Sequence, residues 1–137
     1  MTVLYNKKIT GCEARTIRNL IKEMMASIKN IIDISEEEEY EYRLILNELI
    51  TNSTIHGNKC ICDKSIIASI RVINNSYITI KIEDEGQGFN YKEAINRLGE
   101  KSRQLSERGR GLMLVSSLCD DVKFSKNGNE VCIKKKI

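Results

Sequence analysis

Apolar residues recur every three or four positions between Glu13 and about Ile32, which is typical of an amphipathic helix. The residues of this apolar face are Ile17, Leu20, Ile21, Met24, Met25 and Ile28. A looser alternation of apolar and polar residues precedes the helix in TVLYNKKI and predicts a first strand.

A second helix is predicted from about Glu36 to Ile55. Ser35 is suited to cap its start, because a serine hydroxyl accepts a hydrogen bond from a free backbone N–H there. The acidic run Glu36 to Glu39 favours the positive end of the helix dipole. The helix is expected to end around Gly57-Asn58.

A hairpin is predicted from two isoleucine-rich runs, KSIIASIRVI and YITIKIED, which the turn signal Asn74-Asn75-Ser76 separates. The polar stretch from about Tyr91 to Arg108 is expected to be a mobile loop with a short helix in YKEAINRL. An apolar helix beginning near Leu112 follows in GRGLMLVSSLCD. A last hairpin is predicted from DVKFSK and EVCIKKKI around NGN.

This order of elements predicts the fold class. The elements follow as strand, helix, helix, hairpin, loop, helix and hairpin. Such an order favours an α+β sandwich of two layers, with helices on one face of a mixed, mostly antiparallel sheet. The chain has 137 residues, of which 41% are hydrophobic, and this size and composition suit one domain over residues 1–137.

Composition restricts the cellular location and the classes of partner that we expect for the protein. The formal net charge of +3 is close to neutral and does not indicate a nucleic-acid partner. No apolar segment has the length that spans a bilayer, and the start MTVLYNKKIT lacks the apolar core of a signal peptide. We therefore expect a cytoplasmic protein that contacts neither membrane nor nucleic acid directly.

The five cysteines, an odd number without paired CxxC spacing, agree with a cytoplasmic protein. They are Cys12, Cys60, Cys62, Cys119 and Cys132. Cys119 and Cys132 lie in apolar contexts and are interpreted as small core residues. Cys60 and Cys62 could hold a metal with His56, but their spacing is poor for zinc and a fourth ligand is not evident.

Three polar residues, Glu48, Asn52 and His56, are spaced four positions apart in the otherwise apolar segment NELITNSTIHGNK. This spacing places them on one face of a helix. Polar groups on a buried helix face are costly unless they have a partner, so the face is a candidate site.

Two glycine pairs, Gly86-Gln87-Gly88 and Gly109-Arg110-Gly111, raise the question of phosphate binding. A P-loop needs a following Gly-Lys-Ser/Thr, which the sequence lacks. A dinucleotide fingerprint needs a third glycine, where this chain has Tyr91 or Leu114. Each pair alone indicates a turn as readily as a site.

Taken together, these features resemble the Bergerat-fold ATPases, the superfamily of gyrase, heat-shock chaperones, histidine kinases and mismatch-repair ATPases. Glu48, Asn52 and His56-Gly57 match the N box, DEGQGF the first glycine box and GRGLML the second. Within the superfamily, the small size and the motif series look most like the bacterial anti-sigma factor serine/threonine kinases. The resemblance covers about residues 10 to 135.

The resemblance implies roles for the helix and the strand end. Glu48 would be the base that accepts a proton from the attacking hydroxyl. Asn52 would bind Mg²⁺ through its carbonyl oxygen. Asp84 would accept a hydrogen bond from the exocyclic amine of adenine. His56 is explained at least as well by a core or helix-end position as by a phosphate contact.

The glycine boxes would serve the nucleotide through their backbone. Gly86 and Gly88 would let the backbone approach the base and let the loop hinge. Gly109 and Gly111 would precede the helix that begins near Leu112, where free amides favour phosphate oxygens.

Arg108 and Arg110 would pair with phosphates or lie on the surface of an ATP lid formed by Phe89 to Arg108. One departure from the family pattern stands before the last strand. The family often has a Gly-Thr pair there, whose threonine helps to hold adenine. This chain has Gly128-Asn129-Glu130-Val131, so the adenine contact from that strand is open.

The function implied is that of an ATP-dependent serine/threonine kinase with ATP and Mg²⁺ as cofactors. It would phosphorylate a small antagonist protein, an anti-anti-sigma factor, and regulate a sigma factor. Family likeness favours a homodimer. Two alternatives use the same pocket: an ATP-sensing binding module without kinase activity, and the detached ATP-binding domain of a histidine kinase.

Overall fold

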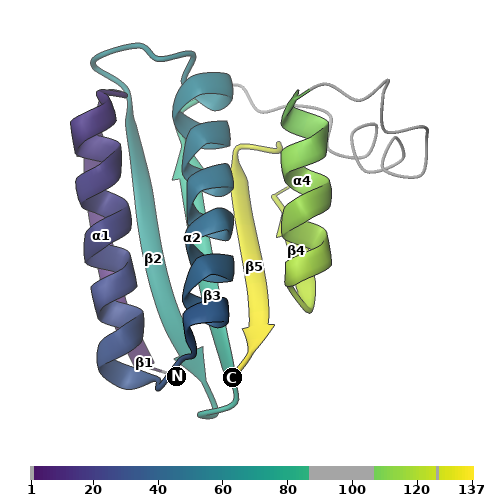
Figure 1. Ribbon diagram of the computed structural model, residues 1–137. Coiled ribbons are helices and arrows are strands. Elements are labelled where there is room, and N and C mark those ends of the chain that lie inside the picture. Colours follow the sequence, from purple (N-terminus) through teal and green to yellow (C-terminus); the bar gives the residue numbers. More distant parts are fainter. Residues whose placement is uncertain (1, 87–106, 126) are drawn as a thin grey trace.

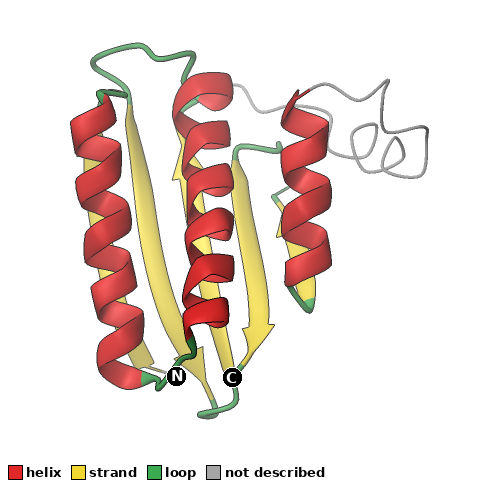
Figure 2. Ribbon diagram, in the orientation of Figure 1, coloured by secondary structure: helices red, strands yellow, loops and turns green. Residues whose placement is uncertain are grey.

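The computed structural model describes residues 2–86, 107–125 and 127–137, in which helices cover one face of a five-stranded sheet (Figures 1 and 2). The strands are β1 (Thr2–Thr10), β2 (Ser65–Ile73), β3 (Tyr77–Asp84), β4 (Asp121–Phe124) and β5 (Glu130–Lys136). The helices are α1 (Ala14–Ile31), α2 (Glu36–Thr51), the π-helix η1 (Asn52–Gly57) and α4 (Glu107–Leu118). Among the described residues, no helix combines the length and apolar character needed to cross a bilayer.

The strand order in the sheet is β1-β2-β3-β5-β4, and every neighbouring pair of these strands is antiparallel. The predicted two-layer α+β fold is therefore confirmed, and the described sheet is wholly antiparallel rather than mixed. Both predicted hairpins are present. Asn74 and Asn75 have φ angles of 52° and 56° in the tight β2–β3 turn, a conformation that asparagine tolerates.

The core lies between the helices and the sheet. α1 contributes Leu20, Met24 and Ile28, and α2 contributes Ile45 and Leu49, each with at most 1% of its surface exposed. Burying a side chain of this kind contributes about 1.5–3 kcal/mol. This packing fixes α2 against the sheet, and therefore fixes where its C-terminal end lies.

The start of α2 is confirmed in detail. The Ser35 hydroxyl accepts a hydrogen bond from the Glu38 backbone N–H at 3.1 Å, and the Glu38 carboxylate accepts one from the Ser35 N–H at 3.2 Å. This reciprocal capping box satisfies two backbone donors that the helix itself leaves free.

The end of α2 differs from the prediction of one regular helix to Ile55. α2 ends at Thr51 and continues as η1, where the Asn58 N–H donates to the Ser53 carbonyl at 2.8 Å. This five-residue spacing makes a wider turn, of a kind that is often found at functional sites. Periodicity of apolar residues does not reveal it, because both helix types continue in the same direction.

The start of α4 also corrects the prediction. The helix begins at Glu107 and not near Leu112, so Gly109 and Gly111 lie within it instead of before it. Each glycine lowers the intrinsic stability of a helix by about 1 kcal/mol, which is why the sequence predicted a later start. Packing of α4 against α2 outweighs that preference.

The cysteines are arranged in a way that the sequence did not predict. Cys12 and Cys60 form a disulfide, so Cys60 is not available as a metal ligand beside His56. Cys119 and Cys132 are partly buried free thiols, and Cys119 packs against the core as expected. Burial raises the pKa of the Cys119 thiol to about 12, which keeps it protonated at neutral pH.

Candidate nucleotide-binding site

A pocket of about 280 Å³, counted with its open mouth, lies where α2 and η1 meet the ends of β3 and β5. Its enclosed space is only about 10 Å³, far below the roughly 300 to 1,000 Å³ of pockets that hold a small-molecule ligand. Its lining residues come from α2, η1, β3, α4 and the β4–β5 hairpin. They are Leu49, Asn52, Ser53, Asp84, Leu112, Phe124, Gly128, Asn129, Glu130 and Val131.

Asp84 reaches this pocket because of the alternation along β3. Ile78, Ile80 and Ile82 are buried on the face of the strand that meets the helices, and Asp84 is the next residue of that row. Its side chain is 8% exposed, and its Oδ1 accepts a hydrogen bond from the Gly86 N–H at 2.8 Å. A carboxylate is thus held at the end of an apolar row, where it lines the pocket.

Two glycines make room for the Asp84 carboxylate. A Cβ atom on Gly57 would lie 2.8 Å from Asp84 Oδ1 and closer still to Oδ2. A Cβ on Gly86 would lie 2.9 Å from the same Oδ1 and would overlap the Gly57 carbonyl. Neither position accepts a side chain without displacement of its neighbours. Gly57, the last residue matched to the N box, is therefore the position at which η1 approaches β3 closely.

Asn52 occupies the junction between α2 and η1. Its backbone N–H donates to both the Glu48 and the Leu49 carbonyl, four and three residues back along the chain. Its side chain is 8% exposed and lines the pocket, and its Nδ2 has no hydrogen-bond partner among the described residues. A buried polar atom without a partner costs about 1–3 kcal/mol. This cost is recovered if the amide binds a ligand.

The Nδ2 and Oδ1 atoms of Asn52 exchange places when the side-chain amide rotates by half a turn. The oxygen can therefore take the position that faces the pocket. A buried amide oxygen suits Mg²⁺, which usually takes one or two protein ligands and completes its shell with water and phosphate. The donor set at Asn52 therefore fits a magnesium–nucleotide complex. In the part of the chain that the structure describes, no cluster of three acidic, histidine or cysteine side chains offers a separate metal site.

Glu48 lies one turn before Asn52 on α2 and is half-buried. A Cβ on Gly111 would overlap Glu48 Oε2 and would lie 2.9 Å from its Cδ. Gly111 is therefore the position at which α4 approaches the Glu48 carboxylate. Its glycine is explained by this contact, which no sequence pattern indicated.

The residues of the second glycine box occupy two different positions in α4, its first turn and the turn that follows. The backbone N–H groups without an intrahelical partner belong to the first four residues, Glu107 to Arg110. The amides of Arg108, Gly109 and Arg110 are therefore placed as a helix start, whereas Gly111 and Leu112 lie one turn further in. Leu112 instead lines the pocket with its side chain, which is 3% exposed.

Some predicted site features lie outside the described residues. They are Gly88, the lid from Phe89 to residue 106 and the side chains of Arg108 and Arg110. His56 is described and is exposed, and it does not line the pocket. Because His56 is exposed whereas Asn52 is buried, the predicted common face of the three residues does not hold for His56.

Two asparagines lie at the site beyond the predicted residues. Asn129 is the residue whose replacement of the family's adenine-contacting threonine the sequence leaves open, and Asn58 is one that the sequence does not indicate as a site residue. Asn129 lines the pocket, donates through Nδ2 to the Asp84 carbonyl at 3.2 Å and accepts from the Ser125 hydroxyl at 3.1 Å. Asn58 is 2% exposed; its Nδ2 donates to the Ser65 carbonyl at 2.9 Å, and its Oδ1 accepts from the Glu85 N–H at 2.8 Å. The signal for Asn129 was its place after Gly128, where the family often has a Gly-Thr pair, and no comparable signal marked Asn58.

Comparison with known proteins places this geometry in context. The sequence profile of the histidine kinase-like ATPase domain matches residues 12–135. An anti-sigma F factor of Clostridium acetobutylicum is 29% identical over 118 residues, which cover 82% of this chain and 80% of the relative. An anti-sigma F factor of Clostridium perfringens is 30% identical over 110 residues, covering 77% and 78%.

Among solved structures, the chain is similar to the histidine kinase domain of the Erythrobacter litoralis EL346 blue-light activated histidine kinase, with a TM-score of 0.56. The sequence identity is 15%, so this likeness concerns the fold alone. The match covers 88% of this chain and 60% of that structure.

Proposed function

The chain belongs to the histidine kinase-like ATPase domain family, with anti-sigma F factors among its relatives, and from this we propose that it is an ATP-dependent serine/threonine kinase acting as an anti-sigma factor. The observation that carries the proposal is the pocket that Asp84 and Asn52 both line, in which Asn52 Nδ2 has no hydrogen-bond partner among the described residues. We further propose that residues 1–137 work as one domain.

Asp84 supplies selectivity for the base. Its carboxylate accepts a hydrogen bond from the exocyclic amine of adenine, whereas guanine has a carbonyl oxygen at that position. With guanine bound, its carbonyl oxygen and the Asp84 carboxylate would face each other without a donor between them. Burial of an acceptor without a donor is strongly disfavoured. The Gly86 N–H holds the carboxylate in position from the side.

Asn52 and the start of α4 serve the phosphates. Asn52 would hold Mg²⁺, and the ion would supply positive charge to neutralise the phosphates of the nucleotide. The free amides of the first turn of α4 point to phosphate oxygens, and the positive end of the helix dipole adds to this attraction. Arg108 and Arg110 belong to the same turn, and we propose that they pair with the phosphates.

Glu48 acts as the base. The hydroxyl oxygen of a serine or threonine forms a bond to the γ-phosphorus, while the bond from that phosphorus to the β–γ bridging oxygen breaks and ADP leaves. The Glu48 carboxylate accepts the proton of the hydroxyl. Gly111 orients it, because only a residue without a side chain permits the observed approach of α4.

The partners follow from the relatives. An anti-sigma F factor is named for a sigma factor, and we propose that this chain binds one and phosphorylates a small antagonist protein. Cytoplasmic location and a homodimer complete the proposal.

The test is phosphoryl transfer from labelled Mg²⁺–ATP to candidate antagonist proteins. Acid-stable phosphoserine or phosphothreonine supports the proposal. Acid-labile phosphate on a partner histidine favours a detached histidine kinase domain, and ATP binding without transfer to any partner favours a sensing module.

A matched pair of variants on α2 sharpens this test. Glu48→Gln keeps the shape of the side chain and is expected to bind ATP normally but to lose transfer by about 10²- to 10⁴-fold, the usual contribution of a general base. Glu37→Gln changes an exposed glutamate in the first turn of the same helix and is expected to leave the rate unchanged. Equal activity of both variants would remove Glu48 from the mechanism.

A further inference from the structure

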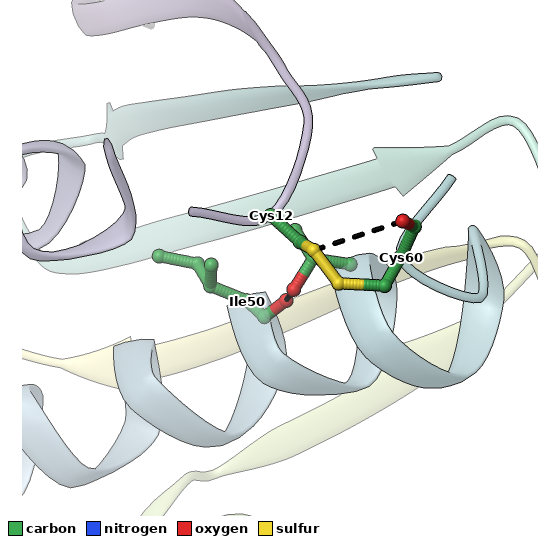
Figure 3. Close-up of a disulfide and its surroundings, with 4 residues drawn as sticks. Cys12, Ile50 and Cys60 are labelled. Carbon is green, nitrogen blue, oxygen red and sulfur yellow. Dashed lines mark hydrogen bonds between the residues drawn. A yellow bond between two sulfur atoms is a disulfide. The ribbon is translucent and has the colours of Figure 1, made fainter. Parts of the chain in front are cut away.

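A disulfide joins two segments that are far apart in the sequence. Cys12 lies between β1 and α1, and Cys60 lies three residues after the end of η1, with a sequence separation of 48 and a Cα–Cα distance of 5.4 Å (Figure 3). The bond therefore ties the entrance of α1 to the segment that leaves the nucleotide pocket.

This segment controls the rim of the pocket through Asn58, two residues before Cys60. The Asn58 side chain bonds to the Ser65 carbonyl at the start of β2 and to the Glu85 N–H at the end of β3. Glu85 follows Asp84 directly, so Asn58 fixes the backbone beside the proposed adenine acceptor. A shift of residues 58–60 would therefore move the Asp84 carboxylate relative to Asn52.

The backbone between Asn58 and the disulfide has an unfavourable conformation. Lys59 and Cys60 have φ angles of 55° and 56°, in the left-handed region that residues other than glycine seldom adopt. Three restraints hold them there. The Cys60 N–H donates to the Thr54 carbonyl at 2.9 Å, the Ile61 N–H donates to the Asn58 carbonyl at 3.2 Å across the turn, and the Cys60 sulfur is bonded to Cys12. Reduction removes the covalent restraint and leaves the two hydrogen bonds to hold two residues in an unfavourable conformation.

The bond is also accessible. Cys60 is exposed and Cys12 is partly exposed, and exposed disulfides exchange with external thiols more readily than buried ones. Cys62, two residues along, is an exposed free thiol. In a reducing cytoplasm, a disulfide of this kind is more often regulatory than structural.

We propose that Cys12 and Cys60 form a thiol–disulfide switch that raises nucleotide affinity when oxidised; the inference rests on the proposed function of the pocket. A small-molecule disulfide such as oxidised glutathione is the oxidant. One cysteine thiolate attacks it, forming a mixed disulfide and releasing one glutathione thiolate. The second cysteine thiolate attacks the mixed disulfide and releases the other glutathione, so the two protein thiols lose two electrons and two protons while two glutathione thiols form.

The coupling must be reciprocal. If oxidation raises affinity for nucleotide by some factor, bound nucleotide raises the equilibrium constant for disulfide formation by the same factor. Couplings between sites are typically about 5- to 150-fold, and we expect about fivefold here, because the disulfide acts through Asn58 and contacts no ligand itself.

The experiment measures the dissociation constant of ADP by calorimetry on the full chain in oxidised and reduced glutathione, with the Cys12–Cys60 bond quantified by mass spectrometry. We expect about fivefold tighter binding by the oxidised form. Cys12→Ser and Cys60→Ser are expected to bind at the reduced affinity in both buffers. Cys62→Ser is the control and retains the full response.

The outcomes separate the two proposals. Equal ADP affinity in both forms overturns the switch and leaves the proposed function standing. Absence of ADP binding in both forms overturns the proposed function and the switch with it. A bond that resists excess reduced glutathione also overturns the switch, because the disulfide is then structural. A redox equilibrium that bound ADP shifts by the same factor supports it.

Discussion

Helices α1 and α2 cover the same face of the sheet, but they end differently (Figure 1). α1 buries only apolar side chains, and its chain leaves the helix in an extended conformation at Ile32. α2 also buries apolar side chains along most of its length. It then continues into η1, where Asn52, Ser53 and Thr54 are all buried. Polar burial on the helix layer is thus concentrated where α2 meets the pocket.

The difference between the two helices distinguishes residues that stabilise the fold from residues that bind a ligand. Thr54 satisfies its hydroxyl by donating to the Ile50 carbonyl at 2.8 Å, as a buried polar group normally does. Asn52 does not satisfy its Nδ2 within the described residues. Stability alone favours the α1 pattern, so the exception at Asn52 points to a ligand. Mutations in the two regions should therefore affect stability and binding separately.

The largest effect is expected from α1. Ile28→Ala removes a fully buried side chain and should lower the free energy of unfolding by about 2–5 kcal/mol. Ile31→Ala, at an exposed position of the same helix, should change it by less than about 0.5 kcal/mol. Urea unfolding measures both. The nucleotide dissociation constant of Ile28→Ala should equal that of the wild type at a temperature where the variant is folded. A changed constant would contradict the expectation that stability and binding are affected separately.

The next effect concerns ligand binding and leaves the apo protein nearly unchanged. Asp84→Asn keeps an oxygen that can accept from the Gly86 N–H, but its amide would oppose the amine of adenine. Nucleotide at a hundredfold above its dissociation constant should stabilise the wild type by about 2.7 kcal/mol, and the variant should lose most of this. Thermal unfolding with Mg²⁺–ATP and Mg²⁺–GTP checks the result. Retained preference for ATP would exclude Asp84 as the base reader.

The first half of α2 should behave like ordinary core. Desolvation, followed by the nearby Glu38 carboxylate, raises the pKa of Tyr42 from 10.0 to about 12. Because the pKa of Tyr42 is higher in the folded than in the unfolded protein, burial of the neutral phenol contributes fully to the free energy of unfolding below pH 10. This contribution is lost as the pH rises toward 12. Unfolding measured at rising pH should show wild type losing on the order of 1 kcal/mol more than Tyr42→Phe by about pH 11. Parallel curves would contradict the shift.

The same contrast explains what the sequence could predict. The strands, the apolar stripe of α1 and the cap at Ser35 follow from local patterns, and the structure confirms them. The wide turn of η1 and the glycine-containing start of α4 depend on contacts between distant segments. Gly111 permits the approach to Glu48, and no periodicity encodes such a pair.

Among the site residues, Asp84 and Asn52 could be found because they interrupt apolar patterns and match family boxes. Both line the pocket. Asn58 could not be found, because its role is to bridge the starts and ends of strands that only the folded chain brings together. The Cys12–Cys60 bond escaped prediction for the same reason, since 48 residues separate its halves.

The smallest expected effect is the most direct test of the contrast between the helices. Asn52→Leu replaces the unpaired amide with an apolar side chain of similar size, as on α1. The apo protein should become more stable by about 1 kcal/mol, because the buried Nδ2, which has no partner in the described part of the chain, is removed. Stabilisation by Mg²⁺–ATP should disappear in the same variant. Urea unfolding with and without nucleotide measures both quantities. A destabilised apo protein would mean that the Asn52 amide serves the fold, and the ligand would no longer be needed to explain its burial.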